Sequence, residues 1–135
     1  MILQNYIEQH RSIIIEIDAI KKFTSSGNIT ENASEIALHI SALAGKIKMH
    51  LVNEDKFLYP DLVSRGNPEV SKLAEQYQNE MGGLAEVFIQ FKDSYNTKSK
   101  IVGKDNELMK SAKAIIEQIE KRIAKEEKEL YILID

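Results

Sequence analysis

Cysteine and tryptophan are absent from this sequence of 135 residues, and proline occurs only twice. The lack of cysteine excludes disulfides, thiolate nucleophiles, thiolate metal sites and iron–sulfur clusters. With two prolines and six glycines, the chain has few of the residues that interrupt helices. No segment approaches the roughly 20 consecutive apolar residues of a membrane-spanning helix. These absences favour a helical protein whose chemistry depends on imidazole, carboxylate and hydroxyl groups.

The charges are of both signs and nearly balanced, with 29% charged residues and a net charge of −3. This balance offers no basic face for nucleic acid and no reason to expect binding to anionic lipid, so we expect neither partner. The opening Met-Ile-Leu-Gln-Asn-Tyr lacks the basic and apolar regions of a signal peptide. We therefore expect a cytoplasmic protein that folds as one domain over residues 1–135.

Apolar residues recur every three or four positions, which predicts an all-α protein. Asn67 and Pro68 are typical of a helix start, Pro60 predicts a kink or an early helix end near residue 59, and Gly82-Gly83 predicts close packing or a local break. We expect helices over residues 2–24, from the turn at 25–32 to about 63, over 68–96 and over 101–134. Four helices joined by short loops predict an up-down-up-down four-helix bundle.

Two histidines and a glutamate are the first candidate site residues. His50 and Glu54 are four positions apart, so on a helix they share one face and can reach a common point. Imidazole and carboxylate are ligand types for iron, zinc and manganese. His10 lies in the apolar stripe of the first helix, where a histidine can be a hydrogen-bonded core residue or a ligand.

A second copy of this pattern occurs 72 residues later, which indicates an internal duplication. A weaker echo relates residues 10–20 to residues 81–91 at an offset of 71. Two helical hairpins would then be related by a pseudo-twofold axis. The copies share these residues: Glu54, Leu58 and Tyr59 in the first, and Glu126, Leu130 and Tyr131 in the second. The inner positions would be His10, His50 and Glu54 in one hairpin, with Met81, Arg122 and Glu126 in the other.

The pattern resembles that of hemerythrin-like (HHE cation-binding) domains, which are four-helix bundles that hold two iron ions among their helices. The family has a His on helix 1, His-x-x-x-Glu on helix 2, a His on helix 3, and His-x-x-x-Glu or Asp on helix 4. The resemblance covers nearly the whole chain and implies iron as the cofactor. The matching positions, which it implies as metal ligands, are His10, His50, Glu54 and Glu126.

Met81 and Arg122 stand where the family pattern has histidines. A thioether is a poor ligand for iron, and Met81 has an ordinary interpretation as a core residue. If Arg122 points inward, it can clamp Glu54 and Glu126, and it would repel a cation about 5 Å away by about 3 kcal/mol at an effective dielectric near 20. If it points to solvent, a coordination position is left vacant. The sequence therefore leaves three alternatives open, in which the iron is mononuclear, dinuclear or absent.

Three functions remain open at this stage. The first is a metal-binding protein with a reduced or altered site, in which Glu80 or Glu127 could supply further ligands. The resemblance then implies binding or sensing of dioxygen, nitric oxide or iron. The second is a metal-free descendant, in which an ion-pair network of Arg122 with Glu54 and Glu126 replaces the metal and the bundle acts as a structural or partner-binding module.

The third function, an oxidase-like enzyme, is disfavoured because oxygen chemistry needs a well-defined cluster with open positions. We therefore expect a protein that is not an enzyme. Tyr59 and Tyr131 are predicted to pack at the end of the bundle, with a phenolate ligand as the alternative.

Overall fold

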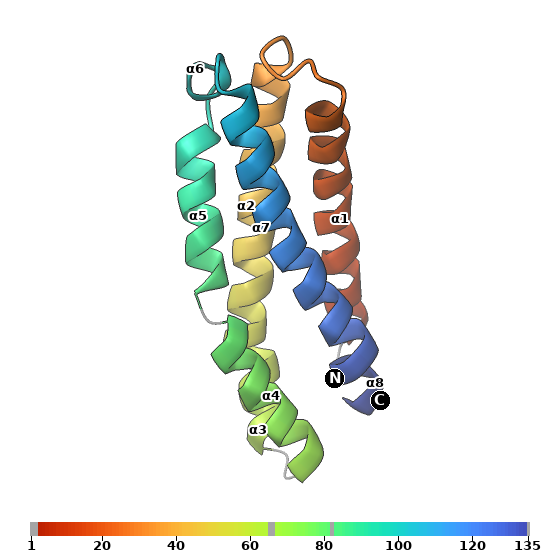
Figure 1. Ribbon diagram of the computed structural model, residues 1–135. Helices are drawn as coiled ribbons and strands as arrows, with labels where there is room; N and C mark the ends of the chain where they lie inside the picture. Colours follow the sequence, from red (N-terminus) through yellow and green to blue (C-terminus); the bar gives the residue numbers. More distant parts are fainter. Residues whose placement is uncertain (1–2, 65–66, 82, 135) are drawn as a thin grey trace.

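The computed structural model describes residues 3–64, 67–81 and 83–134, which are helical apart from short turns and contain no strand (Figure 1). The elements are α1 (Leu3–Ser25), α2 (Ala33–Asn53), the π-helical turn η1 (Glu54–Leu58), α3 (Tyr59–Ser64), α4 (Pro68–Met81), α5 (Leu84–Tyr95), α6 (Lys98–Ile101), α7 (Asp105–Lys125), a second π-helical turn η2 (Glu126–Leu130) and α8 (Tyr131–Ile134). The prediction of an all-α fold is confirmed.

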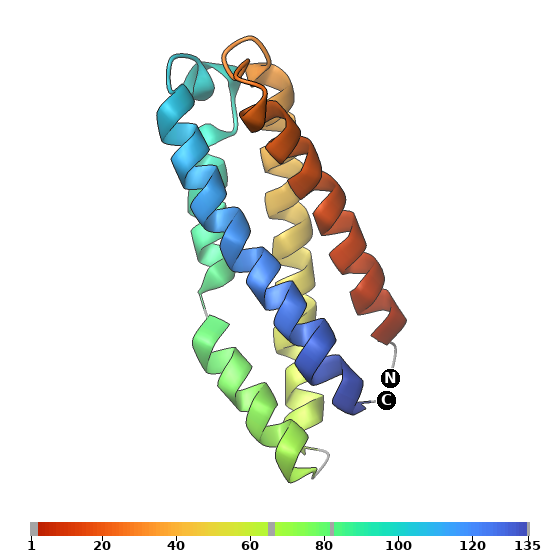
Figure 2. The same cartoon turned by 45° about the vertical axis from the view of Figure 1, so that its right-hand side comes forward.

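These elements form the four rods of an up-down-up-down bundle, as predicted (Figures 1 and 2). The rods are α1, then α2 with η1 and α3, then α4 with α5, and finally α7 with η2 and α8. Helix α1 packs against α2 and α7, and α5 packs against α2 and α7. Both views place the start of α1 and the end of α8 at the same end of the bundle.

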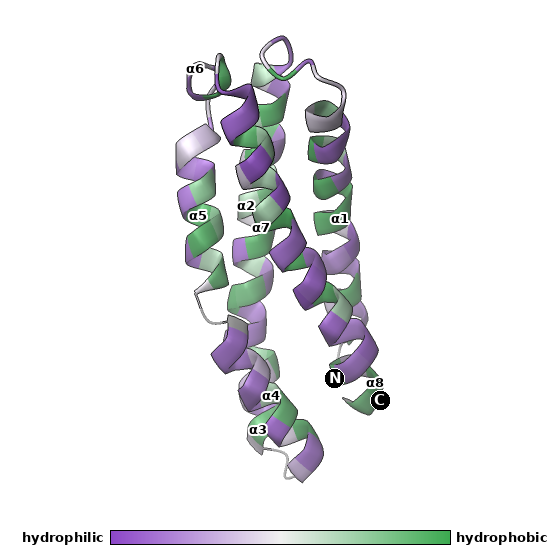
Figure 3. Cartoon of the chain, viewed as in Figure 1, coloured by the Kyte–Doolittle hydropathy of each residue, from purple (hydrophilic) through white to green (hydrophobic). Residues whose placement is uncertain are grey.

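Two apolar clusters fill the bundle, one on each side of a polar layer. The larger one joins α1, α2, α5 and α7 through residues such as Ile17, Ile40, Phe88 and Ile119. The smaller one joins η1, α3, α4 and η2. In Figure 3 the residues of α2 inside the bundle are mostly hydrophobic, whereas the outward face of α7 is hydrophilic. Because each fully buried aliphatic side chain contributes about 1.5–3 kcal/mol, these clusters supply the main driving force for folding.

The second rod continues past Pro60 to Ser64, close to the predicted end near residue 63, so the alternative of an early end at residue 59 is wrong. A π-helical turn over Glu54–Leu58 precedes the proline, and the helix continues as α3 to Ser64. In this turn the Tyr59 N–H donates to the Glu54 carbonyl, five residues back. The second π-helical turn, Glu126–Leu130, has the same position in the fourth rod, where no proline follows. Proline is therefore not required for this turn.

The third rod starts as predicted and breaks where the glycine pair lies. The Asn67 side-chain oxygen accepts hydrogen bonds from the backbone N–H groups of Glu69 and Val70 at 3.1 and 3.3 Å, so Asn67 caps α4. Helix α4 ends at Met81, and α5 begins after Gly83, whose φ of 89° lies in the left-handed region. The predictions for Gly82 and for the side chain of Met81 fall outside the described residues.

The fourth rod begins at Asp105, not near residue 101 as expected. Residues up to Ile101 form the separate short helix α6, and Gly103 turns the chain with a φ of 81°. Thr30 connects this turn to the first loop, because its hydroxyl donates to Asp105 at 2.7 Å and accepts from the Gly103 N–H at 3.3 Å. None of the helices within the described ranges is long and apolar enough to cross a membrane.

The break at Gly83 gives a test of the fold. An L residue is strained at its φ of 89°, so Gly83→Ala should lower the free energy of unfolding by about 1–2 kcal/mol. Gly45 is the matched control, because it lies inside α2 and an added Cβ would meet no atom within 4 Å at either position. Gly45→Ala should raise the free energy of unfolding by about 0.5–1 kcal/mol. Urea unfolding measures both, and a stabilising Gly83→Ala would contradict the strained turn.

Candidate metal centre

Five charged or polar side chains are almost completely buried in the layer between the two apolar clusters. Helices α1 and α2 each supply a histidine, α7 supplies an arginine, and each π-helical turn begins with a glutamate. The five residues are His10, His50, Glu54, Arg122 and Glu126, which are at most 2% exposed. Buried charges are costly unless they are paired, so this layer is the strongest candidate for a functional site.

The two imidazoles present their Nε2 atoms to each other and their Nδ1 atoms to the outside of the layer. His10 Nδ1 lies 2.6 Å from a carboxylate oxygen of Glu127, and His50 Nδ1 lies 2.6 Å from the amide oxygen of Gln9. Both oxygens are acceptors, so each Nδ1 carries a proton and each neutral imidazole has its lone pair on Nε2. The two Nε2 atoms are 3.0 Å apart. Two lone pairs at this distance require a proton or a cation between them.

Each carboxylate presents one oxygen to this pair. Glu126 Oε1 lies 3.0 Å from His10 Nε2 and 3.7 Å from His50 Nε2. Glu54 Oε1 lies 3.3 Å from His50 Nε2. One donor atom from each of the four residues lies within 4.8 Å of all the others. Metal–ligand bonds of about 2.0–2.2 Å place opposite donors about 4 Å apart, so this donor set fits a single ion.

Arg122 points into the site and pairs with both carboxylates. Its Nη2 atom lies 3.0 Å from Glu54 Oε1, and its Nε atom lies 3.4 Å from Glu126 Oε2. The guanidinium also lies over the Tyr59 ring, 5.7 Å from the centroid. The alternative in which Arg122 swings to solvent is therefore wrong. A permanent positive charge thus lies against Glu54 Oε1, the oxygen that also faces His50, and against Glu126 Oε2, and it would repel a second cation placed beside these carboxylates.

Two tyrosines donate hydrogen bonds from one copy of the duplicated pattern to the other. Tyr59 donates to Glu126 Oε2 at 2.5 Å, and Tyr131 donates to Glu54 Oε2 at 2.9 Å. Each tyrosine thus reaches the glutamate of the other sequence copy. Both rings pack in the smaller apolar cluster toward one end of the bundle, as predicted, and their hydroxyl groups in addition hold the outer oxygens of the two carboxylates.

The π-helical turns explain how these tyrosines enter the site. In an uninterrupted α-helix, residues five apart point about 140° away from each other. A π-helical turn adds one residue to the turn, so Glu54 and Tyr59 both face the interior, as do Glu126 and Tyr131. Each π-helical turn therefore adds a hydroxyl donor to the polar layer without removing the glutamate from it.

The two carboxylates have opposite pKa shifts. Burial raises the pKa of Glu54 well above its ordinary value of 4.5, and the nearby Glu126 carboxylate raises it further. Burial alone would also raise the pKa of Glu126. Without a metal, a proton lies on the Nε2 side of His10 and His50, and the hydrogen bonding of this pair to Glu126, together with the charge of Arg122, outweighs burial, so that pKa lies well below 4.5. Without a metal, Glu54 is therefore the carboxyl that retains a proton, and Glu126 neutralises Arg122.

The pKa shifts of His50 and of the two tyrosines indicate that these side chains are neutral. Burial lowers the pKa of His50, which keeps its imidazole neutral and able to bind a cation. Burial also raises the pKa of Tyr59 and of Tyr131, and the two neighbouring carboxylates raise both further. Both tyrosines are therefore neutral hydrogen-bond donors, which argues against the phenolate alternative.

The remaining sequence candidates lie outside the ligand set. Glu80 is on the surface and pairs with Lys125 at 3.2 Å, and Glu127 contacts the outward Nδ1 of His10. Neither adds a donor atom to the centre. No sequence pattern identified Gln9 as the partner of His50, since a glutamine on a helix surface looks the same whether or not it bonds to a buried histidine. The hydroxyl donors Tyr59 and Tyr131 were also missed from the sequence, although their repetition 72 residues apart was a usable signal.

Comparison with known proteins gives one result. The model of the family described as "Hemerythrin HHE cation binding domain" matches residues 1–134, which is nearly the whole chain. Neither the search of curated proteins nor the search of solved structures found a match.

The raised pKa of Glu54 predicts how stability depends on pH. A group whose folded-state pKa is raised contributes stability below its unfolded value of 4.5, and this stability is lost as pH rises through the folded-state pKa. Glu54→Gln keeps the shape and remains neutral, so the melting temperature of the metal-free variant should exceed that of wild type by an increasing margin above pH 4.5. Thermal unfolding after chelation measures this margin.

The exposed Glu75 supplies the control for this experiment. Glu75→Gln should follow the wild-type melting temperature at every pH. A margin for Glu54→Gln that stays constant, or shrinks as pH rises, would contradict the assignment of a raised pKa to Glu54.

Proposed function

Because the chain belongs to the hemerythrin HHE cation-binding family, we propose that it binds a single iron ion through the four donor residues of the buried layer. The observation that carries this proposal is the convergence of the two imidazole Nε2 atoms, 3.0 Å apart, while both Nδ1 atoms face acceptor oxygens. Carboxylate oxygens on the same side complete the donor set. The proposed ligands are His10, His50, Glu54 and Glu126.

The count of one ion follows from the position of Arg122. The Arg122 guanidinium already pairs with both carboxylates, and a second cation beside it would be repelled by several kcal/mol at an effective dielectric near 20. Two carboxylates and one guanidinium carry one net negative charge, so one divalent ion that replaces the proton on Glu54 leaves a net charge of +1, whereas a second divalent ion would raise it to +3. Metal binding should therefore release a proton.

We propose further that the protein binds or senses a small ligand such as dioxygen or nitric oxide, and that it is not an enzyme. Iron, when bound, supplies a coordination position for such a ligand. The chain's own residues hold the site in place: Gln9 and Glu127 orient the imidazoles, while Tyr59 and Tyr131 orient the carboxylates. Apolar clusters on both sides limit the access of water.

A metal-free role is the second candidate, and one observation favours it. Among the described residues, every buried side-chain nitrogen and oxygen has a hydrogen-bond partner without a metal. The network of Arg122 with Glu54 and Glu126 can therefore complete the core by itself, and the bundle would then act through its outer surface.

Metal content separates the two candidates. Protein without a histidine tag, expressed in iron-supplemented medium, should contain about one equivalent of iron by mass spectrometry. His50→Ala should reduce this well below stoichiometry, because one ligand is lost. His39→Ala should retain the metal, since His39 lies outside the centre and contacts Glu16. A wild-type protein with little metal, and with no uptake on reconstitution, would refute the proposal.

Replacement of Arg122 tests how far its positive charge stabilises the buried carboxylates. Arg122→Met should lower the free energy of unfolding of the metal-free protein by about 3–5 kcal/mol, because the buried Glu126 carboxylate loses its cation and Glu54 loses an N–H donor. Lys121→Met removes the same charge from the exposed neighbouring position and should change the free energy by less than about 0.5 kcal/mol. Under the one-ion proposal, added iron restores much of the lost stability of Arg122→Met. No recovery with iron would favour the metal-free role.

A further inference from the structure

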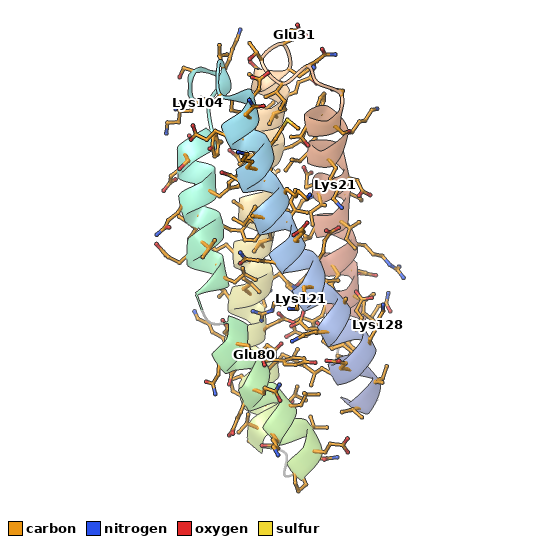
Figure 4. All side chains as sticks on the ribbon, viewed as in Figure 1. Lys21, Glu31, Glu80, Lys104, Lys121 and Lys128 are labelled. Carbon is orange, nitrogen blue, oxygen red and sulfur yellow. The ribbon has the colours of Figure 1, made fainter. Side chains whose placement is uncertain are left out.

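A surface cleft of about 610 Å³ lies between the break in the third rod and helix α7. Its walls come from the end of α4, the start of α5 and one face of α7. Figure 4 shows Glu80, at the end of α4, and Lys121, on α7, in this region of the molecule. The cleft is lined by Glu80, Gly83, Leu84, Val87, Gln118, Lys121, Arg122 and Lys125.

The cleft is open because the third rod is interrupted beside it. Gly83 turns the chain with a φ of 89°, and a Cβ added there would meet no atom within 4 Å. The position therefore faces open space. An uninterrupted helix would instead place a continuous row of side chains along this wall. The break that the sequence predicts at the glycine pair thus leaves room for a ligand beside the buried layer.

The lining of this cleft has an excess of positive charge. Lys121, Arg122 and Lys125 face a single acidic residue of the lining, Glu80, which pairs with Lys125 at 3.2 Å and also accepts a hydrogen bond from Gln76. Since Glu126 offsets the charge of Arg122 from inside the bundle, the excess amounts to the charge of Lys121. Arg122 is almost completely buried and uses two N–H donors for the carboxylates of the centre. A guanidinium has five N–H donors, so others remain for a ligand in the cleft.

We propose that this cleft binds a small anion that carries a carboxylate or phosphate group. Lys121 supplies an exposed ammonium group, and Lys125, one turn further along α7, supplies a second one that pairs with Glu80. Arg122 supplies planar donors at the inner wall. Gln118 adds a side-chain amide on the same face, and the apolar Leu84 and Val87 can contact a short carbon chain. The volume suits a metabolite-sized anion.

A second groove of the molecule has a different charge pattern. That groove, of about 540 Å³, lies between α1 and α7. Its lysines face a similar number of acidic residues, and Lys21 there pairs with Glu120 at 2.7 Å. An anion would find no net attraction in this groove. The excess of positive charge coincides with the open break in the third rod and with the buried arginine.

The anion site and the metal centre share Arg122, but the two proposals rest on separate observations. The cleft depends on exposed lysines and on the break in the third rod, whereas the metal proposal depends on the imidazoles and carboxylates. Anion binding is therefore measured on metal-free protein, so that failure of one proposal leaves the other standing. Low ionic strength is needed, because salt screens exposed charges within about 10 Å at 0.1 M.

Isothermal titration calorimetry on the full metal-free chain is the test, with inorganic phosphate and succinate as separate probes. Wild type should bind at least one of them saturably at about one equivalent, and the stronger probe identifies phosphate or carboxylate as the preferred group. Lys121→Gln/Lys125→Gln should weaken that binding at least tenfold. The control, Lys110→Gln/Lys113→Gln, removes two lysines of α7 that do not line the cleft and should change it less than twofold.

Two results would overturn the proposal. One is the absence of saturable binding of both probes to wild type. The other is an equal loss of binding in both double variants, which would show a response to net charge rather than a site. Circular dichroism and urea unfolding accompany each titration, and because all four lysines are exposed or half-exposed, the variants should keep the wild-type fold.

Discussion

The interaction on which the rest of the structure depends is the pairing of Arg122 with two buried carboxylates. Glu54 and Glu126 have no contact with bulk water, and each would cost several kcal/mol to bury as an unpaired charge. The guanidinium, the two tyrosine hydroxyls and the proton on Glu54 together offset this cost. Because these groups come from the second and fourth rods, the polar layer also determines how the two rods are aligned.

The duplication gives this layer its geometry. Each copy contributes a π-helical turn that begins with a glutamate and ends just before a tyrosine, and each tyrosine bonds to the glutamate of the other copy. The symmetry ends at the position where one copy has His50 and the other has Arg122. This difference places a fixed positive charge in a layer that also holds two imidazoles, and the charge opposes the binding of a second cation beside the carboxylates.

Much of the fold could be predicted because it depends on local patterns. The apolar spacing predicted the four rods, and Asn67 with the Gly82-Gly83 pair marked a helix start and a break. The remaining differences have specific causes. Pro60 left a kink or an early helix end open, and the helix continues because a proline near the end of a rod is tolerated after a π-helical turn. The role of Tyr59 and Tyr131 was missed because a period of 3.6 residues places them on another face of the helix.

The sequence by itself determined the helical class, the duplication, the resemblance to an HHE domain and the candidate residues of the centre, because these follow from spacing along the chain. Only the tertiary structure decided that Arg122 turns inward and that Glu80 and Glu127 stay outside the centre. The orientation of an arginine depends on which carboxylates lie beside it and on the cost of burying them without it. These partners are 68 and four residues away from Arg122, and they meet only when the rods pack.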